Sequence, residues 1–119
     1  MNQPVQEPGE EEPGLVIMTV RDFQGQLIKL TAGQWAHFTV LRPYLIAMEW
    51  AVRETLENPE EVRKSERAPH SRLYYRRYTN TVLGDKFMCV VVKFLENDAF
   101  ISTAYLARKI NPGELIWRK

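Results

Sequence analysis

The segment LYYRRYTNTVLGDKFMCVVVKF at residues 73–94, followed by FISTAYL at residues 100–106, decides the fold. Leu73–Tyr78, Phe87–Phe94 and Phe100–Leu106 are rich in aromatic and β-branched side chains, which favour strands. The residues that separate these three segments are mostly the polar residues and glycine of turns. The pattern therefore predicts an antiparallel meander.

Upstream of the meander, the apolar residues change to a helical spacing. Leu45, Met48, Val52 and Leu56 recur every three to four residues with charged side chains between them, which predicts an amphipathic helix. We expect this helix to follow Pro43 in its first turn and to stop at Asn58-Pro59, because the residue before a proline disfavours helical geometry.

Two further segments complete the N-terminal half of the fold. Gly33–Leu41 carries apolar residues at helical spacing after Thr31, a suitable N-cap, and is predicted to end near Arg42. Leu15–Val20 and Gln26–Leu30 flank a short polar connection and are predicted to pair as a hairpin.

At the C-terminus, Asn111-Pro112-Gly113 predicts a turn before a last short apolar segment, Leu115–Trp117. The expected fold is therefore α+β, with an N-terminal hairpin and two helices packed on one face of a roughly four-stranded antiparallel sheet. The other face of that sheet is expected to be open and polar, and a ligand would bind there.

Length and charge describe one basic domain behind an acidic tail. The chain has 119 residues, and residues 15–119 are predicted to form a single domain. Residues 1–14 hold four of the 15 acidic residues and no Lys or Arg, so we expect a flexible acidic tail. The remaining residues hold 16 basic and 11 acidic side chains, a net charge of +5. This charge is compatible with a polyanionic partner, although cationic strands also keep sheet edges soluble.

Several classes of protein and site are excluded. The longest apolar stretches have the length of a strand, so no membrane span or membrane partner is predicted. The N-terminus lacks the basic start of a secretory signal, so a cytoplasmic location is expected. Cys89 is the single cysteine and cannot form an internal disulfide. With only His37 and His70 beside it, the sequence predicts no metal site and no cofactor.

Few side chains offer chemistry on their own. His37 lies between Trp35 and Phe38 in the first predicted helix, where it is either a proton-transfer group or a partly buried space-filling residue. His70 is expected to be an ordinary loop residue. Glutamates on the second helix could act as a general base, but solvated surface carboxylates are far commoner; they are Glu49, Glu54 and Glu57.

The stretch RAPHSRLYYRRY at residues 67–78 intersperses arginines with tyrosines. Arginine binds phosphate with two parallel hydrogen bonds and tyrosine stacks on bases, a combination that suits single-stranded nucleic acid. The two faces of a strand divide the set: Leu73, Tyr75 and Arg77 point one way, and Tyr74, Arg76 and Tyr78 the other. The alternative is a structural strand with tyrosines in the core and arginines in water.

Six short motifs in order resemble a known family: DFQGQLIKLT (22–31) running into WAHF (35–38), ETLENPEEV (54–62), LYYRR (73–77), VVVK (90–93), STAY (102–105) and GELIW (113–117). Together they resemble the phage-associated branch of the barnase, EndoU, colicin tRNase and RelE-like nuclease superfamily. The resemblance spans roughly Val20 to Trp117.

The resemblance implies helices followed by a four-stranded antiparallel sheet, and an enzyme that cuts RNA without a metal. In that reaction the ribose 2′-hydroxyl attacks the adjacent phosphate and leaves a cyclic phosphate. The resemblance implies His37 as the acid or base, with Arg67, Arg76 and Lys93 on the phosphate and Ser102 or Thr103 in the cleft. Nucleic-acid contacts are expected from Arg42, Arg72, Tyr74, Tyr75 and Tyr105.

One departure from the family concerns residues 41–45, which read LRPYL where the family has a stretch similar to Arg-His-Pro-Glu-Leu. A second histidine and a carboxylate are therefore missing here. The expected function is a cytoplasmic endoribonuclease of toxin or phage-conflict type, with RNA and an immunity or antitoxin protein as partners. A non-catalytic RNA-binding module and a protein-interaction domain are the alternatives.

Overall fold

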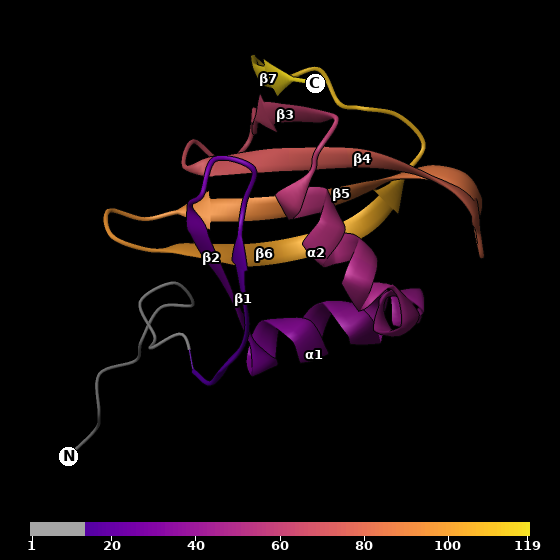
Figure 1. Ribbon diagram of the computed structural model, residues 1–119. Coiled ribbons are helices and arrows are strands. Elements are labelled where there is room, and N and C mark those ends of the chain that lie inside the picture. The colour runs from indigo at the N-terminus through magenta and orange to yellow at the C-terminus, as the bar shows by residue number, and fades with distance from the viewer. Residues whose placement is uncertain (1–13) are drawn as a thin grey trace.

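The computed structural model describes residues 14–119, and Figure 1 shows how their helices and strands are arranged. The elements are β1 (Val16–Arg21), β2 (Leu27–Thr31), α1 (Ala32–Leu41), the 3-10 helix η1 (Pro43–Met48), α2 (Glu49–Glu57), β3 (Glu61–Lys64), β4 (Ser71–Thr81), β5 (Gly84–Phe94), β6 (Ala99–Ala107) and β7 (Leu115–Arg118). This order confirms the α+β class. Apart from Gly14, the predicted acidic tail lies outside the described residues.

The sheet has seven strands in the order β1-β2-β6-β5-β4-β3-β7, so the predicted four-stranded antiparallel sheet is wrong. The β1–β2 hairpin joins the sheet through a parallel bridge between Lys29 and Phe100, which makes the sheet mixed. Strand β3 has the sequence EVRK, whose single apolar residue gives no alternating pattern, and it pairs with both β4 and β7. Sequence patterning misses it because its stability comes from two neighbouring strands.

The helical region is also divided differently from the sequence prediction. Pro43 opens η1, and α2 begins only at Glu49, so one predicted helix is two. Met48, the last residue of η1, is the N-cap residue of α2; it has φ −119° and makes no side-chain capping hydrogen bond. The predicted ends are confirmed elsewhere: Thr31 caps α1 by accepting a hydrogen bond from the Gln34 amide, and α2 stops before Asn58.

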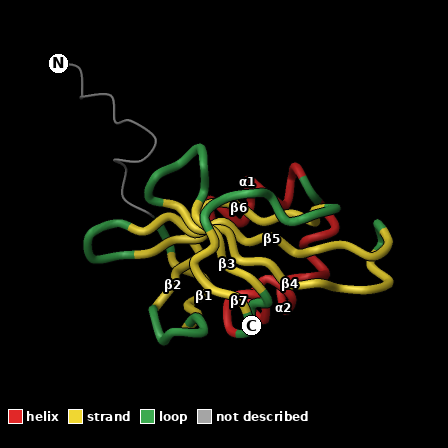
Figure 2. Tube along the Cα trace, turned by 90° about the horizontal axis from the view of Figure 1, so that it is seen from above, coloured by secondary structure: helices red, strands yellow, loops and turns green. Residues whose placement is uncertain are grey.

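The core lies between the helices and one face of the sheet. Buried apolar side chains from α1, η1 and α2 meet those of the central strands, among them Phe38, Leu45, Val52, Leu56, Tyr74, Val90 and Ala104. Figure 1 shows α1 and α2 together on this side, and Figures 1 and 2 both show the β4–β5 hairpin extending past the other strands. Within residues 14–119, no helix covers the opposite face.

A buried carboxylate fastens the turn between β1 and β2 to this core. Asp22 accepts hydrogen bonds from the amides of Gln24 and Gln26, both at 2.9 Å, and from the Tyr74 hydroxyl at 2.7 Å. Its neighbour Phe23 donates its amide to the Leu56 carbonyl oxygen at 3.0 Å. The turn is thus attached to β4 and to the end of α2.

Candidate nucleic-acid groove on the helix-free face

A groove of about 460 Å³ lies on the helix-free face of the sheet. Its lining residues come from the β3–β4 connection, the central strands and the β6–β7 connection: Lys64, Ser65, Glu66, Arg67, Leu73, Val91, Thr103, Tyr105, Asn111, Pro112 and Gly113. The volume falls within the range of about 300–1,000 Å³ that is usual for small-molecule sites.

Strand register builds the floor of this groove. Leu73, Val91 and Thr103 are paired across β4, β5 and β6, so their side chains form one row. The next row, two residues along each strand, contains Tyr75, Cys89 and Tyr105. Tyr75 and Cys89 are fully buried, so only Tyr105 of this row lines the groove and the predicted RNA contact of Tyr75 is wrong. The floor is therefore apolar, with the Thr103 hydroxyl and one aromatic ring at its end.

The connection of residues 108–114, here called the strap, crosses this face to reach β7 and forms one wall. Arg63 donates to the Gly113 carbonyl oxygen at 2.8 Å, and the Asn111 amide donates to the Tyr75 hydroxyl at 3.3 Å. The Lys64 amide donates to the Glu114 carbonyl oxygen at 2.9 Å. Backbone and side-chain bonds thus hold the strap beside β3.

Gly113 packs directly against β3, because a Cβ there would overlap the carbonyl oxygen of Lys64. We expect Gly113→Ala to destabilise the fold by about 1–3 kcal/mol through this overlap. Thermal unfolding measures the change. Gly33→Ala is the matched control, since open space surrounds Gly33; equal stability of the Gly113 variant and wild type would contradict the packing described.

Cations and an acid surround the groove. Arg67 and Lys64 are exposed at the β3–β4 end, together with Glu66. Lys64 lies 3.9 Å from Glu114, a pair so exposed that it contributes little and leaves the ammonium available. Lys93 is exposed two residues after Val91 and therefore points to the same face. The predicted phosphate ligands Arg67 and Lys93 thus share this face.

The first helix runs along the outer edge of β6. Gln34 donates to the Ser102 carbonyl oxygen at 2.7 Å, and the Arg42 guanidinium lies 5.4 Å from the centre of the Tyr105 ring. His37 falls between these two contacts on α1, three residues from Gln34 and therefore on the same side of the helix. Its side chain is exposed, and within residues 14–119 it makes no hydrogen bond or ion pair. The space-filling alternative for His37 does not fit this exposure.

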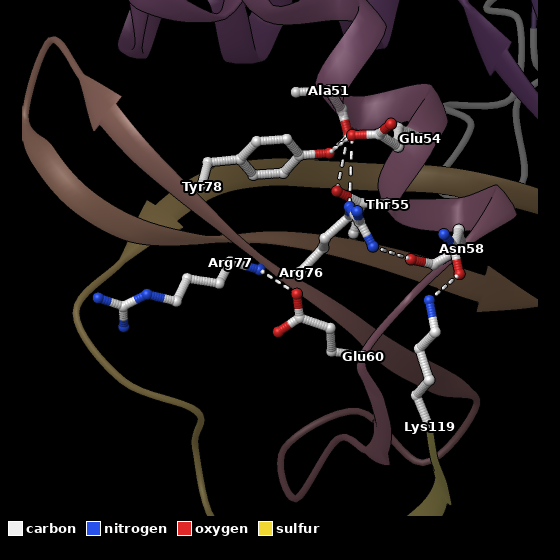
Figure 3. Close-up of polar contacts among 9 residues, drawn as sticks. All are labelled: Ala51, Glu54, Thr55, Asn58, Glu60, Arg76, Arg77, Tyr78 and Lys119. Atoms are coloured by element: carbon white, nitrogen blue, oxygen red, sulfur yellow. Dashed lines mark hydrogen bonds and ion pairs between the residues drawn. The ribbon is translucent and has the colours of Figure 1, made fainter.

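Other predicted contacts lie on the helix-covered face. Tyr74 is fully buried with its hydroxyl on Asp22, and Arg72 lies 4.6 Å from the centre of the Phe94 ring. Arg76 donates to Glu54 at 3.3 Å and to the Asn58 carbonyl oxygen at 2.9 Å, as Figure 3 shows. These three side chains support the fold and are separated from the groove by the sheet.

Figure 3 also shows that the carboxylate of Glu54 on α2 is bound by other side chains. Glu54 accepts from the Tyr78 hydroxyl at 2.7 Å, in addition to Arg76, so its carboxylate joins α2 to β4. Burial, together with the hydrogen bond to Glu54, raises the pKa of Tyr78 above its ordinary value. Glu54 is therefore a structural residue in this arrangement.

The tyrosines and the thiol under the groove are protonated at neutral pH. Burial raises the pKa of the Cys89 thiol to about 11, against the opposing effect of the Tyr105 and Tyr75 hydroxyls. Burial likewise raises the pKa of Tyr75 and of Tyr105 above the ordinary phenol value. Cys89 is fully buried and is not a nucleophile here.

This environment predicts that the Cys89 thiol reacts slowly in the folded protein. At pH 8 we expect Cys89 to react with a disulfide reagent only after denaturant is added, because the folded thiol is buried and protonated. The folded state holds the thiol proton more tightly than the unfolded state, so this group's contribution to stability falls as pH rises through 9 to 11. Rapid labelling of the native protein at pH 8 would contradict the buried position.

The sequence alone did not indicate several groove residues. Ser65 and Asn111 belong to none of the six motifs, and Asn111 was expected only as a turn residue. Ser102 contributes its backbone oxygen to Gln34, whereas Thr103 lines the groove. Among residues 14–119, no group of three His, Cys, Asp or Glu side chains is placed to bind a metal, and no helix is long and apolar enough to cross a membrane.

Comparison of the chain with models of protein families, with curated proteins and with solved structures found no match.

Proposed function

We propose that this protein binds RNA in the groove on the helix-free face and cuts it without a metal ion. One observation carries the proposal: the groove joins exposed cations, hydroxyls and an aromatic ring on one face, and His37 lies along the β6 edge beside it. The resemblance of the sequence motifs to the barnase and RelE-like superfamily supports the reaction type.

The reaction needs two proton transfers and stabilisation of charge on phosphate. The ribose 2′-oxygen forms a bond to phosphorus as its proton passes to His37, and the bond from phosphorus to the 5′-oxygen breaks. The leaving oxygen takes a proton from the Tyr105 hydroxyl, since Tyr105 lines the groove. Arg42, beside the Tyr105 ring, stabilises the developing negative charge, and Arg67 at the other end of the groove holds a neighbouring phosphate. The products are a 2′,3′-cyclic phosphate and a 5′-hydroxyl.

The missing family histidine bears on this assignment. Arg42 stands at that position and contacts the Tyr105 ring, so position 42 lies at the edge of the same groove. A guanidinium cannot accept a proton at neutral pH, but it can hold the ring and attract phosphate. Proton acceptance therefore rests on His37.

A cleavage assay on total RNA in excess chelator tests the proposal. We expect fragments with cyclic phosphate ends, and we expect Arg67→Ala to weaken RNA binding similarly for all sequences and to reduce its salt dependence by about one counterion. Arg53→Ala is the matched control, because Arg53 is exposed on α2 and outside the groove. Intact RNA at high protein concentration would contradict the proposed ribonuclease activity. Unaltered RNA binding by Arg67→Ala would contradict the placement of RNA in the groove.

A further inference from the structure

The outer part of the β4–β5 hairpin, here called the arm (residues 78–86), extends beyond the rest of the sheet, as Figures 1 and 2 show. Strand β3 pairs with β4 only as far as Tyr75, and β6 pairs with β5 only as far as Phe87. Within residues 14–119, the arm therefore has no further strand at either edge. At about 3.3 Å per residue, Val82 at the tip of the arm lies about 13 Å from Tyr78 at its base.

The tip of the arm presents two apolar side chains where turns usually carry polar ones. Val82 is 78% exposed and Leu83 is 49% exposed; together they are called the tip patch. Hydrogen bonds within the turn fix its backbone, because the Thr81 hydroxyl donates to the Gly84 carbonyl oxygen at 2.6 Å and accepts from the Leu83 amide at 3.1 Å. A turn that is already ordered loses little conformational entropy when it binds, which favours its use as a contact.

A second apolar patch lies at the base of the arm, where η1 and α2 supply it. Ile46 is 65% exposed and Trp50 is 58% exposed; together they are called the base patch. The Trp50 indole N–H donates to the Ala47 carbonyl oxygen at 3.2 Å, and the ring packs edge-to-face on Tyr78 with 5.5 Å between the ring centres. The indole is thus held in place with its polar atom satisfied. Tryptophan is among the residues that most often dominate the energy of protein interfaces.

The positions of the two patches suit pairing between two copies of the chain. When two arms lie side by side and antiparallel, the tip of each meets the base of the other, so one two-fold axis forms both contacts at once. Charge does not oppose this pairing, because residues 78–86 contain one acidic and one basic side chain, Asp85 and Lys86. The arm is therefore neutral, although residues 15–119 carry a net charge of +5.

The exposed apolar area is sufficient for such a contact. At these exposed fractions each side chain of the two patches offers on the order of 100 Å² of apolar surface, so a symmetric pair of chains offers about 800 Å². Homodimer interfaces are about 65% apolar, which makes a total interface of about 1,200 Å², the lower end of the range for specific, stable interfaces. An interface of this size is expected to have a dissociation constant in the micromolar range.

From these observations we infer that a second copy of this chain binds at the arm and forms a symmetric dimer, in which the tip patch of each copy packs on the base patch of the other. The residues of both patches lie outside the lining of the groove, so the dimer contact and the proposed RNA contact use different residues. The inference therefore goes beyond the proposed function and does not depend on it.

Sedimentation velocity of the full-length protein over a range of concentrations tests the inference. We expect a reversible equilibrium between one chain and two, with its midpoint in the micromolar range. Leu83→Asp should weaken the dimer at least about tenfold, because the substitution enters both contacts of a symmetric pair. The matched control is Leu15→Asp: Leu15 is also apolar and exposed, but it lies beside the start of α1, where its carbonyl oxygen accepts the Ala32 amide. This variant should associate as wild type does.

Variants of the base patch, and mixtures with the tip variant, separate the proposed contact from other apolar association. Trp50→Ala should also weaken the dimer at least about tenfold. A mixed pair of Leu83→Asp with Trp50→Ala keeps one unaltered contact, whereas each variant paired with itself keeps none. The mixture should therefore associate more tightly than either variant alone. Ile46→Asp, which leaves the Trp50–Tyr78 packing in place, should give the same result as Trp50→Ala.

Three results would overturn the inference. The wild-type protein could stay monomeric at the highest concentration, which would leave the two patches for a different protein. Leu83→Asp could associate as tightly as Leu15→Asp, which would remove the tip patch from the contact. The mixture could associate no more tightly than its separate components, which would contradict the pairing of tip with base. None of these results bears on RNA binding, so failure of the dimer and failure of the proposed function are separate outcomes.

Discussion

Replacing His37 with alanine is expected to lower the rate of RNA cleavage by about a hundredfold to ten-thousandfold, the usual contribution of a positioned acid or base. The imidazole is the only group along the β6 edge of α1, within the described chain, that can accept a proton near neutral pH. Because the side chain is exposed and makes no hydrogen bond there, its removal should leave the melting temperature and RNA affinity nearly unchanged. Single-turnover cleavage of a labelled RNA measures the rate.

The matched control for this experiment is His70→Ala. His70 is also exposed, but it lies in the β3–β4 connection and does not line the groove. The His70 variant should cleave as wild type does. If the His37 variant retains the wild-type rate, the proton acceptor has been assigned to the wrong residue, whatever the affinity for RNA.

Replacing Asp22 with alanine is expected to lower the free energy of unfolding by about 2–4 kcal/mol. The substitution removes three hydrogen bonds and leaves the buried Tyr74 hydroxyl without a partner, and each unsatisfied buried group costs about 1–3 kcal/mol. The turn that carries Phe23 onto Tyr74 and Trp117 should loosen as a consequence. Urea unfolding monitored by tryptophan fluorescence measures the loss.

Asp98→Ala provides the comparison for Asp22. Asp98 forms a 2.8 Å pair with Lys29 at a site where both side chains are partly exposed, and such surface pairs contribute about 0–1 kcal/mol. Similar losses of unfolding free energy for the two variants would mean that the Asp22 carboxylate does not anchor the β1–β2 turn to the core.

The α+β class and the central strands followed from the sequence because apolar periodicity records burial directly. The aromatic and β-branched residues within 73–94 and the spacing of Leu45, Val52 and Leu56 both reflect contact with one core. The side-chain directions predicted for β4 were also correct: Tyr74, Arg76 and Tyr78 contact the hairpin turn or α2, whereas Leu73 and Tyr75 face the other way.

The size of the sheet and the walls of the groove did not follow from the sequence. Strand β3 is mostly charged and is held in the sheet by pairing with its two neighbouring strands. Strand β2 joins β6 by a single parallel bridge. The strap depends on Arg63 and Gly113, whose roles arise from contact with residues 50 positions away or with the β3 backbone. Such pairings leave no local pattern, which is why Arg76 was expected on phosphate although it binds α2.

The most direct test of the account is the location of bound RNA on the sheet. Titration of the isotopically labelled protein with an uncleavable single-stranded RNA, followed by backbone amide chemical shifts, should perturb Val91, Thr103 and the β3–β4 connection. The amide chemical shifts of α2 and of the β1–β2 turn should not change. Shifts confined to the helix-covered side, or no shifts at saturating RNA, would contradict the central claim.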